Sequence, residues 1–408
     1  MSIYCGLISI GNEILLGKTV NTNLAWLGAE LAGMGIEIKE AITVKDEADS
    51  ITEALAHLWE RYDIVLTTGG LGPTEDDITK SAIADFFAVD LVFNDALWER
   101  IKLMFANRGT NIPQVNRSQA LVPRGFVALE NKLGTAPGLH FQQNNKHFFA
   151  LQGVPLEMKH VFDTQIRNIL QLAYPQSQGI IQRTLHTYGI AESALAELIS
   201  TQDLPQELSL AWLPQTGRVD IKITSSSMAP LSQAESLIRS RIEDKIWGVD
   251  EDTPAGVLLD LLRLKRWHLA VAESCTAGLI QAYLGAIPGA SDVLLGGVVS
   301  YANRIKEDLL GVNTIQQHGA VSSETALAMV KGVQKLCASE VAISVTGIAG
   351  PDGGSTEKPV GTVHFAFAIG SKNWSKKLFL TGERQTIRHK AAEAAMLMLT
   401  RLLQDKEI

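Results

Sequence analysis

Short apolar segments alternate with amphipathic segments along this chain, and this alternation constrains the fold more than any other feature. The apolar runs at residues 4–10 and 64–68 have the length and composition of buried strands. Residues 21–34 and 48–62 instead place aliphatic side chains three and four positions apart, the pattern of one buried helix face. Repeated strand–helix units predict a parallel sheet with helices on both faces, so we expect an α/β fold.

The pattern changes twice, and the changes predict three domains. The segment AYPQSQG at 173–179 has the composition of a linker. A helix near 191–200, two strands and a helix from about 231 to 246 follow, which is typical of a small α+β module. Strand–helix alternation then resumes. We therefore expect an α/β domain at residues 1–172, a connecting α+β domain at 173–250 and a second α/β domain at 251–408.

The composition disfavours several classes of function. The formal net charge is −8 and no basic run occurs, so binding to nucleic acid or to an anionic membrane is not expected. The three cysteines are widely spaced, which disfavours a disulfide framework or a zinc site and fits a reducing cytoplasm. We find neither a signal-peptide pattern nor an apolar run long enough to span a bilayer, and we expect a cytoplasmic protein.

Two polar segments within residues 251–408 directly follow apolar runs. AESCTAG begins at Ala272 and carries Ser274, and YANRIK begins at Tyr301 and carries Lys306. In α/β sheets, ligands bind beyond the carboxyl ends of the strands. A serine becomes a nucleophile when a base removes its proton, and a lysine can be that base if a dry pocket lowers its pKa to about 7–8. The two segments together predict a Ser–Lys acyl-transfer site.

A glycine-rich loop, TGIAGPDGGSTEKPVGTV at 346–363, follows another apolar run. Its backbone amides can approach a ligand closely, so it is a candidate oxyanion hole or phosphate site. Thr356, Lys358 and Arg384 are further candidates for binding a substrate phosphate. The residues expected to bind substrate here are Thr276, Tyr301, Gly347, Gly350, Gly353, Gly354 and Arg384.

Simpler alternatives exist for each residue of the proposed Ser–Lys site. Ser274 alone would most often cap a helix, and Lys306 alone would most often be a solvated surface lysine. Cys275 would most often be a small buried hydrophobe, but it is also the rival nucleophile. The co-occurrence of three such segments after strands of one domain favours the catalytic interpretation.

A second glycine-rich segment, GGLGPTEDD at 69–77, follows the apolar run at 64–68. Pro73 can start a helix whose N-terminus attracts phosphate, and Asp76 and Asp77 can hold a divalent metal that bridges a diphosphate. In the alternative, Thr74, Glu75 and Asp76 only cap that helix and complement its dipole. The loop at 11–23, with Glu13 as a candidate ligand or base, and the loop at 134–138 would line the same crevice. The expected ligand-binding residues are Asn23, Gly69, Gly70 and Gly72, with Asp76 and Asp77 as metal ligands.

The C-terminal segments resemble the nicotinamide-nucleotide amidases, which form the C-terminal domain of the competence/damage-inducible CinA proteins. The resemblance covers about residues 253–404 and rests on AESCTAG, VVSYANRIK, HGAVSSETA and TGIAGPDGGSTEKPVGTV. It implies a Ser–Lys amidohydrolase without a cofactor that converts nicotinamide mononucleotide to nicotinate mononucleotide and ammonia. The family nucleophile falls on Ser274 and the family base on Lys306.

Residues 1–170 resemble the molybdopterin-binding-like domain at the N-terminus of CinA proteins, through GNEIL, NTN, GGLGPTEDD, NRSQA, GTAPG and GVP. This resemblance implies an ADP-ribose pyrophosphatase that needs a divalent metal (Mg, Mn or Co) and yields AMP and ribose 5-phosphate. The sequence departs from the family pattern at Leu156, where a small polar residue is usual, and loss of that hydroxyl would weaken a phosphate site. The connecting segment also resembles the middle domain of these proteins.

We therefore expect a bifunctional hydrolase of pyridine-nucleotide salvage, with small nucleotide substrates and no nucleic-acid or membrane partner. The resemblance further implies a homodimer. Two alternatives stay open: an N-terminal domain that binds a pterin or nucleotide without hydrolysing it, and a non-enzymatic regulator of competence or DNA repair.

Overall fold

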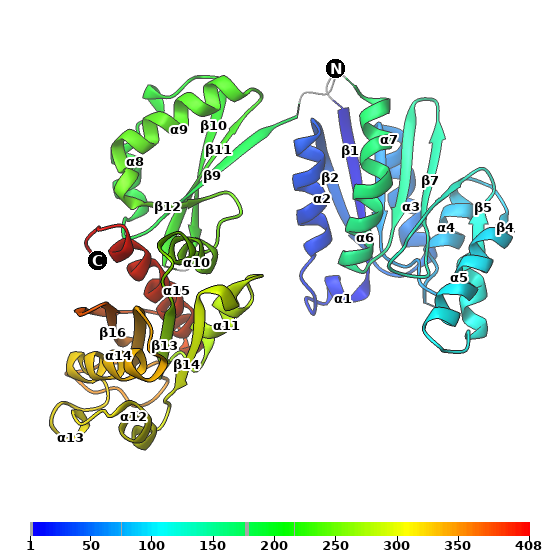
Figure 1. Ribbon diagram of the computed structural model, residues 1–408. Coiled ribbons are helices and arrows are strands. Elements are labelled where there is room, and N and C mark those ends of the chain that lie inside the picture. Colours follow the sequence, from blue (N-terminus) through cyan, green and yellow to red (C-terminus); the bar gives the residue numbers. More distant parts are fainter. Residues whose placement is uncertain (1–2, 75, 176–178, 216) are drawn as a thin grey trace. The chain divides into compact units, whose positions relative to one another are not determined.

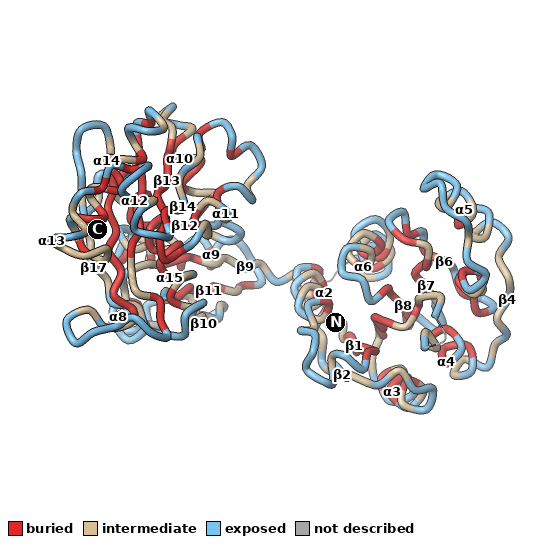
Figure 2. The backbone as a smooth tube through the Cα atoms, turned by 90° about the horizontal axis from the view of Figure 1, so that it is seen from below, coloured by how far each residue is buried: buried red, intermediate tan, exposed pale blue. Residues whose placement is uncertain are grey.

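Figure 1 shows the computed structural model, in which the chain forms two compact units, Met1–Ile181 and Gln182–Ile408. The structure describes residues 3–74, 76–175, 179–215 and 217–408. Within the expected linker at 173–179, residues 176–178 lie outside the described part of the chain. Each unit has its own core, because the buried residues follow the central strands of each (Figure 2).

The first unit contains a six-stranded sheet in the order β2-β1-β3-β8-β7-β6. Its strands are β1 (Ile3–Ile10), β2 (Ile36–Val44), β3 (Ile64–Thr68), β6 (Val127–Leu129), β7 (Gly138–Gln143) and β8 (Lys146–Leu151). β2, β1, β3 and β8 are parallel, with Ser9 opposite Thr68 and Thr68 opposite Leu151, so their carboxyl ends meet at one edge. β7 and β6 are antiparallel to their neighbours. The expected parallel sheet is thus confirmed for its first four strands.

Successive residues of a strand point to opposite sides of the sheet, and helices cover both of these sides. The helices are α1 (Asn12–Leu15), α2 (Thr22–Gly33), α3 (Ala48–Arg61), α4 (Thr79–Phe86), α5 (Asp95–Asn107), α6 (Pro155–Val161) and α7 (Arg167–Ala173). On one face α2, α6 and α7 pack against Leu7 and Phe149. On the other face α3 and α4 pack against Ile8 and Phe148. A separate two-stranded sheet is formed by β4 (Leu91–Phe93) and β5 (Leu121–Pro123), which precede and follow α5 in the sequence.

Among the described residues that follow Pro73, none is helical before Thr79, so the helix expected to start at Pro73 is not observed there. Thr74 donates its backbone N–H and its hydroxyl to Asp77 Oδ2, at 2.9 and 2.5 Å. These bonds stabilise a turn in place of a first helical turn, and α4 begins only at Thr79. The expectation of a phosphate-binding helix N-terminus at Pro73 is therefore wrong, as is the alternative that Thr74 and Asp76 cap such a helix; Glu75 lies outside the described residues.

The second unit begins with a four-stranded sheet in the order β10-β11-β9-β12. Its elements are β9 (Ile181–Thr187), α8 (Glu192–Leu198), β10 (Leu208–Gln215), β11 (Arg218–Ser225), α9 (Met228–Ile242) and β12 (Ile246–Val249). The helix expected to reach residue 246 ends at Ile242, because Ile246 already belongs to β12 and lies opposite Thr187. β9 and β12 had no sequence signal, since β9 is largely polar and β12 is only four residues long.

The remainder of the second unit contains a five-stranded sheet in the order β14-β13-β15-β16-β17. Its strands are β13 (Leu269–Glu273), β14 (Leu294–Val299), β15 (Val341–Gly347), β16 (Thr362–Ile369) and β17 (Lys372–Phe379). Its helices are α10 (Pro254–Lys265), α11 (Leu279–Gly285), α12 (Asn303–Leu310), α13 (Ile315–His318), α14 (Ser323–Cys337) and α15 (Arg384–Leu403). β14, β13 and β15 are parallel, so the segments that follow β13 and β14 leave the same edge of the sheet.

Helices again cover both faces of the sheet. α10, α11 and α15 pack on one face, around Leu258, Val271 and Leu399, and α14 packs on the other, around Ala270 and Val330. Among the helices of the described residues, we find none that is both long and apolar enough to cross a bilayer.

Candidate active sites

Ser274 lies on a turn after β13 that a buried carboxylate holds in place. Glu273 is 0% exposed and accepts hydrogen bonds from the backbone N–H groups of Gly278, Ile280 and Gln281, at 2.8, 3.2 and 2.9 Å. This carboxylate pairs donors that the start of α11 would otherwise leave unpaired. Ser274 therefore does not cap a helix, and among the described residues no hydrogen bond engages its Oγ.

Lys306 is an internal lysine of α12. Its side chain is 1% exposed, and Nζ donates to the carbonyl oxygens of Ser300 at 2.7 Å and Tyr301 at 3.2 Å. Burial lowers the pKa of Lys306 from its ordinary value of 10.5. A neutral amine has two N–H donors and one lone pair, so the two carbonyls match its donors and leave the lone pair free to accept a proton. The alternative of a solvated surface lysine does not describe this residue.

Ser274 and Lys306 line one cavity of about 280 Å³ at the carboxyl edge of the sheet. Of the residues expected to bind substrate, the cavity is also lined by Tyr301, Gly347, Gly350, Gly353 and Arg384. Gly354 and the fully buried Thr276 are not part of the lining. No hydrogen bond between Ser274 Oγ and Lys306 Nζ occurs among the described residues, so proton transfer between them requires a side-chain rotation or a bridging water.

Arg384, the first residue of α15, connects two parts of this cavity. Its guanidinium donates to the Tyr301 hydroxyl at 2.7 Å and to the carbonyl oxygen of Gly350. The exposed guanidinium thus holds the glycine-rich loop beside the segment that carries Lys306 and places a positive charge at the cavity. Thr356 and Lys358, the other phosphate candidates, do not line the cavity, and Lys358 Nζ donates to the His318 carbonyl at 3.1 Å.

Cys275, the rival nucleophile, lines the same cavity but is buried at 6% exposure. Burial raises the pKa of the Cys275 thiol to about 12. Because the thiolate is the reactive form of cysteine, this environment keeps Cys275 as an unreactive thiol. Ser274 is therefore the better candidate nucleophile.

A second candidate site lies at the carboxyl edge of the first unit's sheet. It is a cavity of about 340 Å³ lined by the loop from Gly70 to Pro73, by Asp77, Gln119 and Gln152, and by Glu157 of α6. Two of the expected glycines have no room for a side chain, since a Cβ at Gly70 would lie 2.1 Å from Thr79 Oγ1 and a Cβ at Gly72 would lie 2.3 Å from Asp77 Oδ2. Gly69 is outside the lining but has a φ of 113°, and it lets the loop leave β3.

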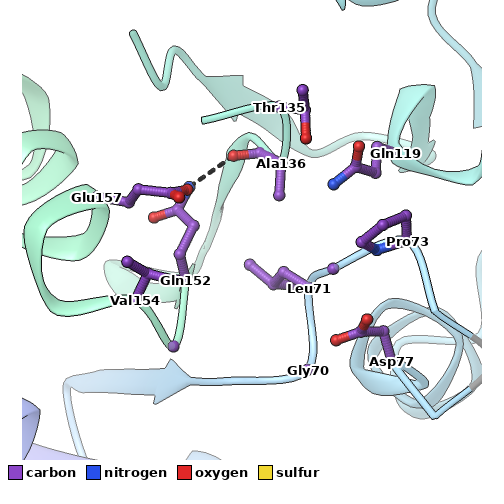
Figure 3. Close-up of a pocket in the computed structure, with 12 residues that line it drawn as sticks. Gly70, Leu71, Pro73, Asp77, Gln119, Thr135, Ala136, Gln152, Val154 and Glu157 are labelled. Atoms are coloured by element: carbon purple, nitrogen blue, oxygen red, sulfur yellow. Dashed lines mark hydrogen bonds between the residues drawn. The ribbon is translucent and has the colours of Figure 1, made fainter. Parts of the chain in front are cut away.

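The acidic groups of this cavity come from its two sides. In Figure 3, Asp77 and Glu157 lie on opposite sides with Leu71 between them. Asn131 Nδ2 donates a hydrogen bond to Glu157 Oε2 at 2.6 Å. The other expected metal ligand, Asp76, is exposed and is not part of the lining. Within the described ranges, no group of three or more His, Cys, Asp or Glu side chains is arranged to hold a metal ion. A divalent metal here would therefore depend on ligand phosphates and water for most of its coordination.

Lys80 of α4 interacts electrostatically with Asp77, which lines this cavity, and no pattern in the sequence singled it out. It is buried at 6% exposure, and its Nζ donates to the Ser118 carbonyl at 2.6 Å. Burial lowers the pKa of Lys80 to about 8, against the opposing attraction of Asp77. Leu156, the departure from the family pattern, is 67% exposed and lines neither this cavity nor the smaller one that contains Asn23.

Three family models match the chain. They are the Probable molybdopterin binding domain at residues 6–172, the Damage-inducible protein CinA KH domain at 182–248 and the CinA C-terminal domain at 251–403. A CinA-like protein of Cytophaga hutchinsonii is 38% identical over 413 aligned residues, covering 99% of each chain. The chain belongs to the CinA family.

The chain is also similar to a second full-length relative and, over part of its length, to a solved structure. A putative competence-damage inducible protein of Caldanaerobacter subterraneus subsp. tengcongensis is 39% identical, covering 98% of this chain and 99% of the relative. Among solved structures, the competence/damage inducible protein CihA from Agrobacterium tumefaciens is 39% identical and covers 37% of this chain and 93% of its own, with a TM-score of 0.36. The three family models and the two full-length relatives together cover essentially the whole chain.

Sequence reasoning missed the roles of several residues that line the two cavities or support the segments around them. Glu273 and Asn303 lie within the segments AESCTAG and YANRIK, so only their roles were missed. Gln152 and Glu157 flank the motif GVP and line the first unit's cavity. Lys80 could have been suspected only from its place one residue into α4, directly after the glycine-rich loop.

Proposed function

We propose that this CinA-family protein is a bifunctional hydrolase of nucleotides. The second unit would deamidate nicotinamide mononucleotide, and the first would hydrolyse ADP-ribose. The observation that supports the amidase activity is the amine of Lys306, 1% exposed, which shares a cavity with the unengaged hydroxyl of Ser274. The resemblance of these segments to nicotinamide-nucleotide amidases supplies the substrate.

In the proposed amidase reaction, neutral Lys306 accepts the Ser274 proton as Oγ attacks the carboxamide carbon. Backbone amides of the glycine-rich loop or of the Ser274 turn bind the oxyanion, and one such donor is worth about 10²–10³ in rate. The intermediate collapses to an ester on Ser274, and the Lys306 ammonium returns the proton to the leaving nitrogen, which departs as ammonia. Water, with Lys306 again as the base, then cleaves the ester, releases nicotinate mononucleotide and restores Ser274.

The amidase proposal is tested by ammonia release from nicotinamide mononucleotide with the full chain. Ser274→Ala and Lys306→Arg should each be nearly inactive, because the first lacks the nucleophile and arginine does not give up its proton. Cys275→Ala is the matched control and should retain activity. An active Lys306→Arg enzyme, or loss of activity in Cys275→Ala with retention in Ser274→Ala, would refute the assignment.

For the first unit, the proposal rests on the cavity's chemistry together with the family resemblance. The glycine loop brings backbone amides to the cavity, and Asp77 and Glu157 supply carboxylates on its two sides. These groups fit a divalent ion that arrives with a diphosphate, since Mg²⁺ commonly binds one or two carboxylates plus phosphates and water. When bound, the ion would neutralise charge on the diphosphate.

The chain's own groups would then position the ADP-ribose. Glu157, fixed by Asn131, and Asp77, fixed by Thr74, keep their carboxylates at the cavity, and Lys80 adds a positive charge beside Asp77. The test is formation of AMP and ribose 5-phosphate from ADP-ribose with added Mg²⁺ or Mn²⁺. Asp77→Asn should reduce that turnover and leave the amidase unchanged. Undiminished turnover in Asp77→Asn would exclude this residue from the site.

A further inference from the structure

A cavity of about 190 Å³ in the second unit is separate from the cavity that contains Ser274, and the two have no lining residue in common. Its lining comes from the residues that follow β9 and from the start of β11, in the four-stranded sheet, and from β17 and α15, which belong to the part with the five-stranded sheet. We call it the junction cavity, because both parts of the second unit line it.

Part of the junction cavity's lining is apolar. Tyr188, Leu378 and Leu380 line the cavity and also pack against the core beside the five-stranded sheet. Leu397, which is almost fully buried, adds to the same lining. Pockets for drug-sized ligands measure about 300–1,000 Å³, so this smaller cavity suits a molecule of about one ring.

The charged part of the lining carries one excess positive charge. Among the described residues, it consists of Arg218, Lys390 and Glu393. Arg218 Nη1 donates to Glu393 Oε2 at 2.7 Å, so this carboxylate is already paired. Lys390 Nζ donates to the Thr381 carbonyl at 2.8 Å. Because an ammonium has three donors, two donors of Lys390 remain for a ligand.

Two further groups of the lining are donors that lack a hydrogen-bond partner among the described residues. Arg218 Nε is buried and unpaired, since Asp220 Oδ1 is 3.5 Å away. Burial raises the pKa of Tyr188 to about 12, so its hydroxyl keeps its proton and remains a donor. A buried donor left unpaired is costly, so a ligand that fits this cavity supplies acceptor atoms.

We propose that the junction cavity binds a small monocarboxylate with an apolar body, such as a ring carboxylic acid. Lys390 and Arg218 bind the carboxylate, and the three leucines pack against the apolar body. A phosphate monoester fits less well, because its second negative charge has no partner in the lining and would lie beside leucine side chains. The site is independent of both proposed activities.

The test compares two ligands of the same shape on the full chain by fluorine NMR. One ligand, para-fluorobenzoate, carries the carboxylate, and the other, para-fluorobenzamide, is its neutral isostere. The benzoate should bind about tenfold more tightly or better, because it accepts charge-assisted hydrogen bonds from both cations. Equal affinities, or no binding of the benzoate at millimolar concentration, would overturn the proposal.

Variants of one lysine then locate the bound carboxylate. Lys390→Met should weaken benzoate binding about tenfold and leave the affinity for the benzamide unchanged, whereas Lys390→Arg keeps the charge and should bind nearly as the parent does. Lys376→Met is the matched control, since Lys376 also donates to a main-chain oxygen, that of Ile408, and lies outside the cavity. Undiminished benzoate binding in Lys390→Met would refute the assignment.

The same probe distinguishes the junction cavity from the cavity that contains Ser274, where Arg384 also offers a positive charge. Arg384→Gln should leave benzoate binding at the parent level, and nicotinamide mononucleotide should not displace the benzoate. Displacement by the nucleotide, or loss of binding in Arg384→Gln with retention in Lys390→Met, would place the carboxylate in the Ser274 cavity and overturn the proposal.

Discussion

Replacing Glu273 by glutamine tests why Ser274 is available as a nucleophile. The parent carboxylate accepts from three backbone N–H groups and from Gln281 Nε2, through both of its oxygens. A glutamine keeps one acceptor oxygen and turns the other position into a donor that faces N–H groups. At about 1–3 kcal/mol for each unpaired donor, with Gly278 only partly buried, we expect a loss of about 2–5 kcal/mol in unfolding free energy.

Such a loss should lower the melting temperature of the second unit by roughly 5–15 °C without preventing folding. Because the turn from Ser274 to Gly278 would rearrange, amidase turnover should fall at least tenfold. Thermal unfolding of the full chain and ammonia release measure the two effects. Glu340→Gln is the matched control: Glu340 is exposed and also accepts from a backbone N–H, that of His268, and its loss should cost below about 1 kcal/mol. Parent-like melting and turnover in Glu273→Gln would refute the capping role.

Three further predictions concern pH, metal and substrate affinity. Burial lowers the pKa of His140 to about 4 and also lowers that of His147, so the folded state favours neutral rings. Stability should therefore be full above about pH 6.5 and decline as pH falls from there toward about 4. His140→Phe should flatten that decline in acid-unfolding curves, and an unchanged decline would show that other groups cause it. A chelator should abolish ADP-ribose turnover and leave the amidase unchanged, and an equal effect on both would show that our metal assignment is wrong. Arg384→Gln should raise the KM for nicotinamide mononucleotide about tenfold or more with a smaller change in kcat, whereas an unchanged KM would remove Arg384 from substrate binding.

Much of the fold could be predicted because the central strands are continuous apolar runs. The helices expected at 21–34 and 48–62 are observed as α2 and α3, and the apolar run at 64–68 is β3. β17 was missed because it is an edge strand whose outward side chains are exposed, so lysines interrupt its apolar pattern. The loop after Pro73 was misassigned because the side-chain bonds from Thr74 to Asp77 compete with a helical start, and propensity alone does not show this competition.

The C-terminal cavity could be anticipated, because Ser274 and Lys306 follow β13 and β14, which are parallel neighbours. The role of Glu273 could not, since it depends on a turn that brings three amides to one carboxylate. In the first unit, the sequence alone indicated the adjacent residues Asp76 and Asp77 equally as metal ligands. Only the folded loop shows that Asp77 lines the cavity and Asp76 is exposed.

The proposed amidase mechanism depends on a neutral amine at Lys306. The pKa of the Lys306 amine can be followed by NMR of lysine labelled at Cε, in the Ser274→Ala variant, with the signal assigned by its absence in Lys306→Arg. We expect a pKa below the ordinary 10.5, with parent amidase activity lost as pH falls through that same value, because protonation removes the base. A pKa at or above 10.5 would contradict the proposed mechanism.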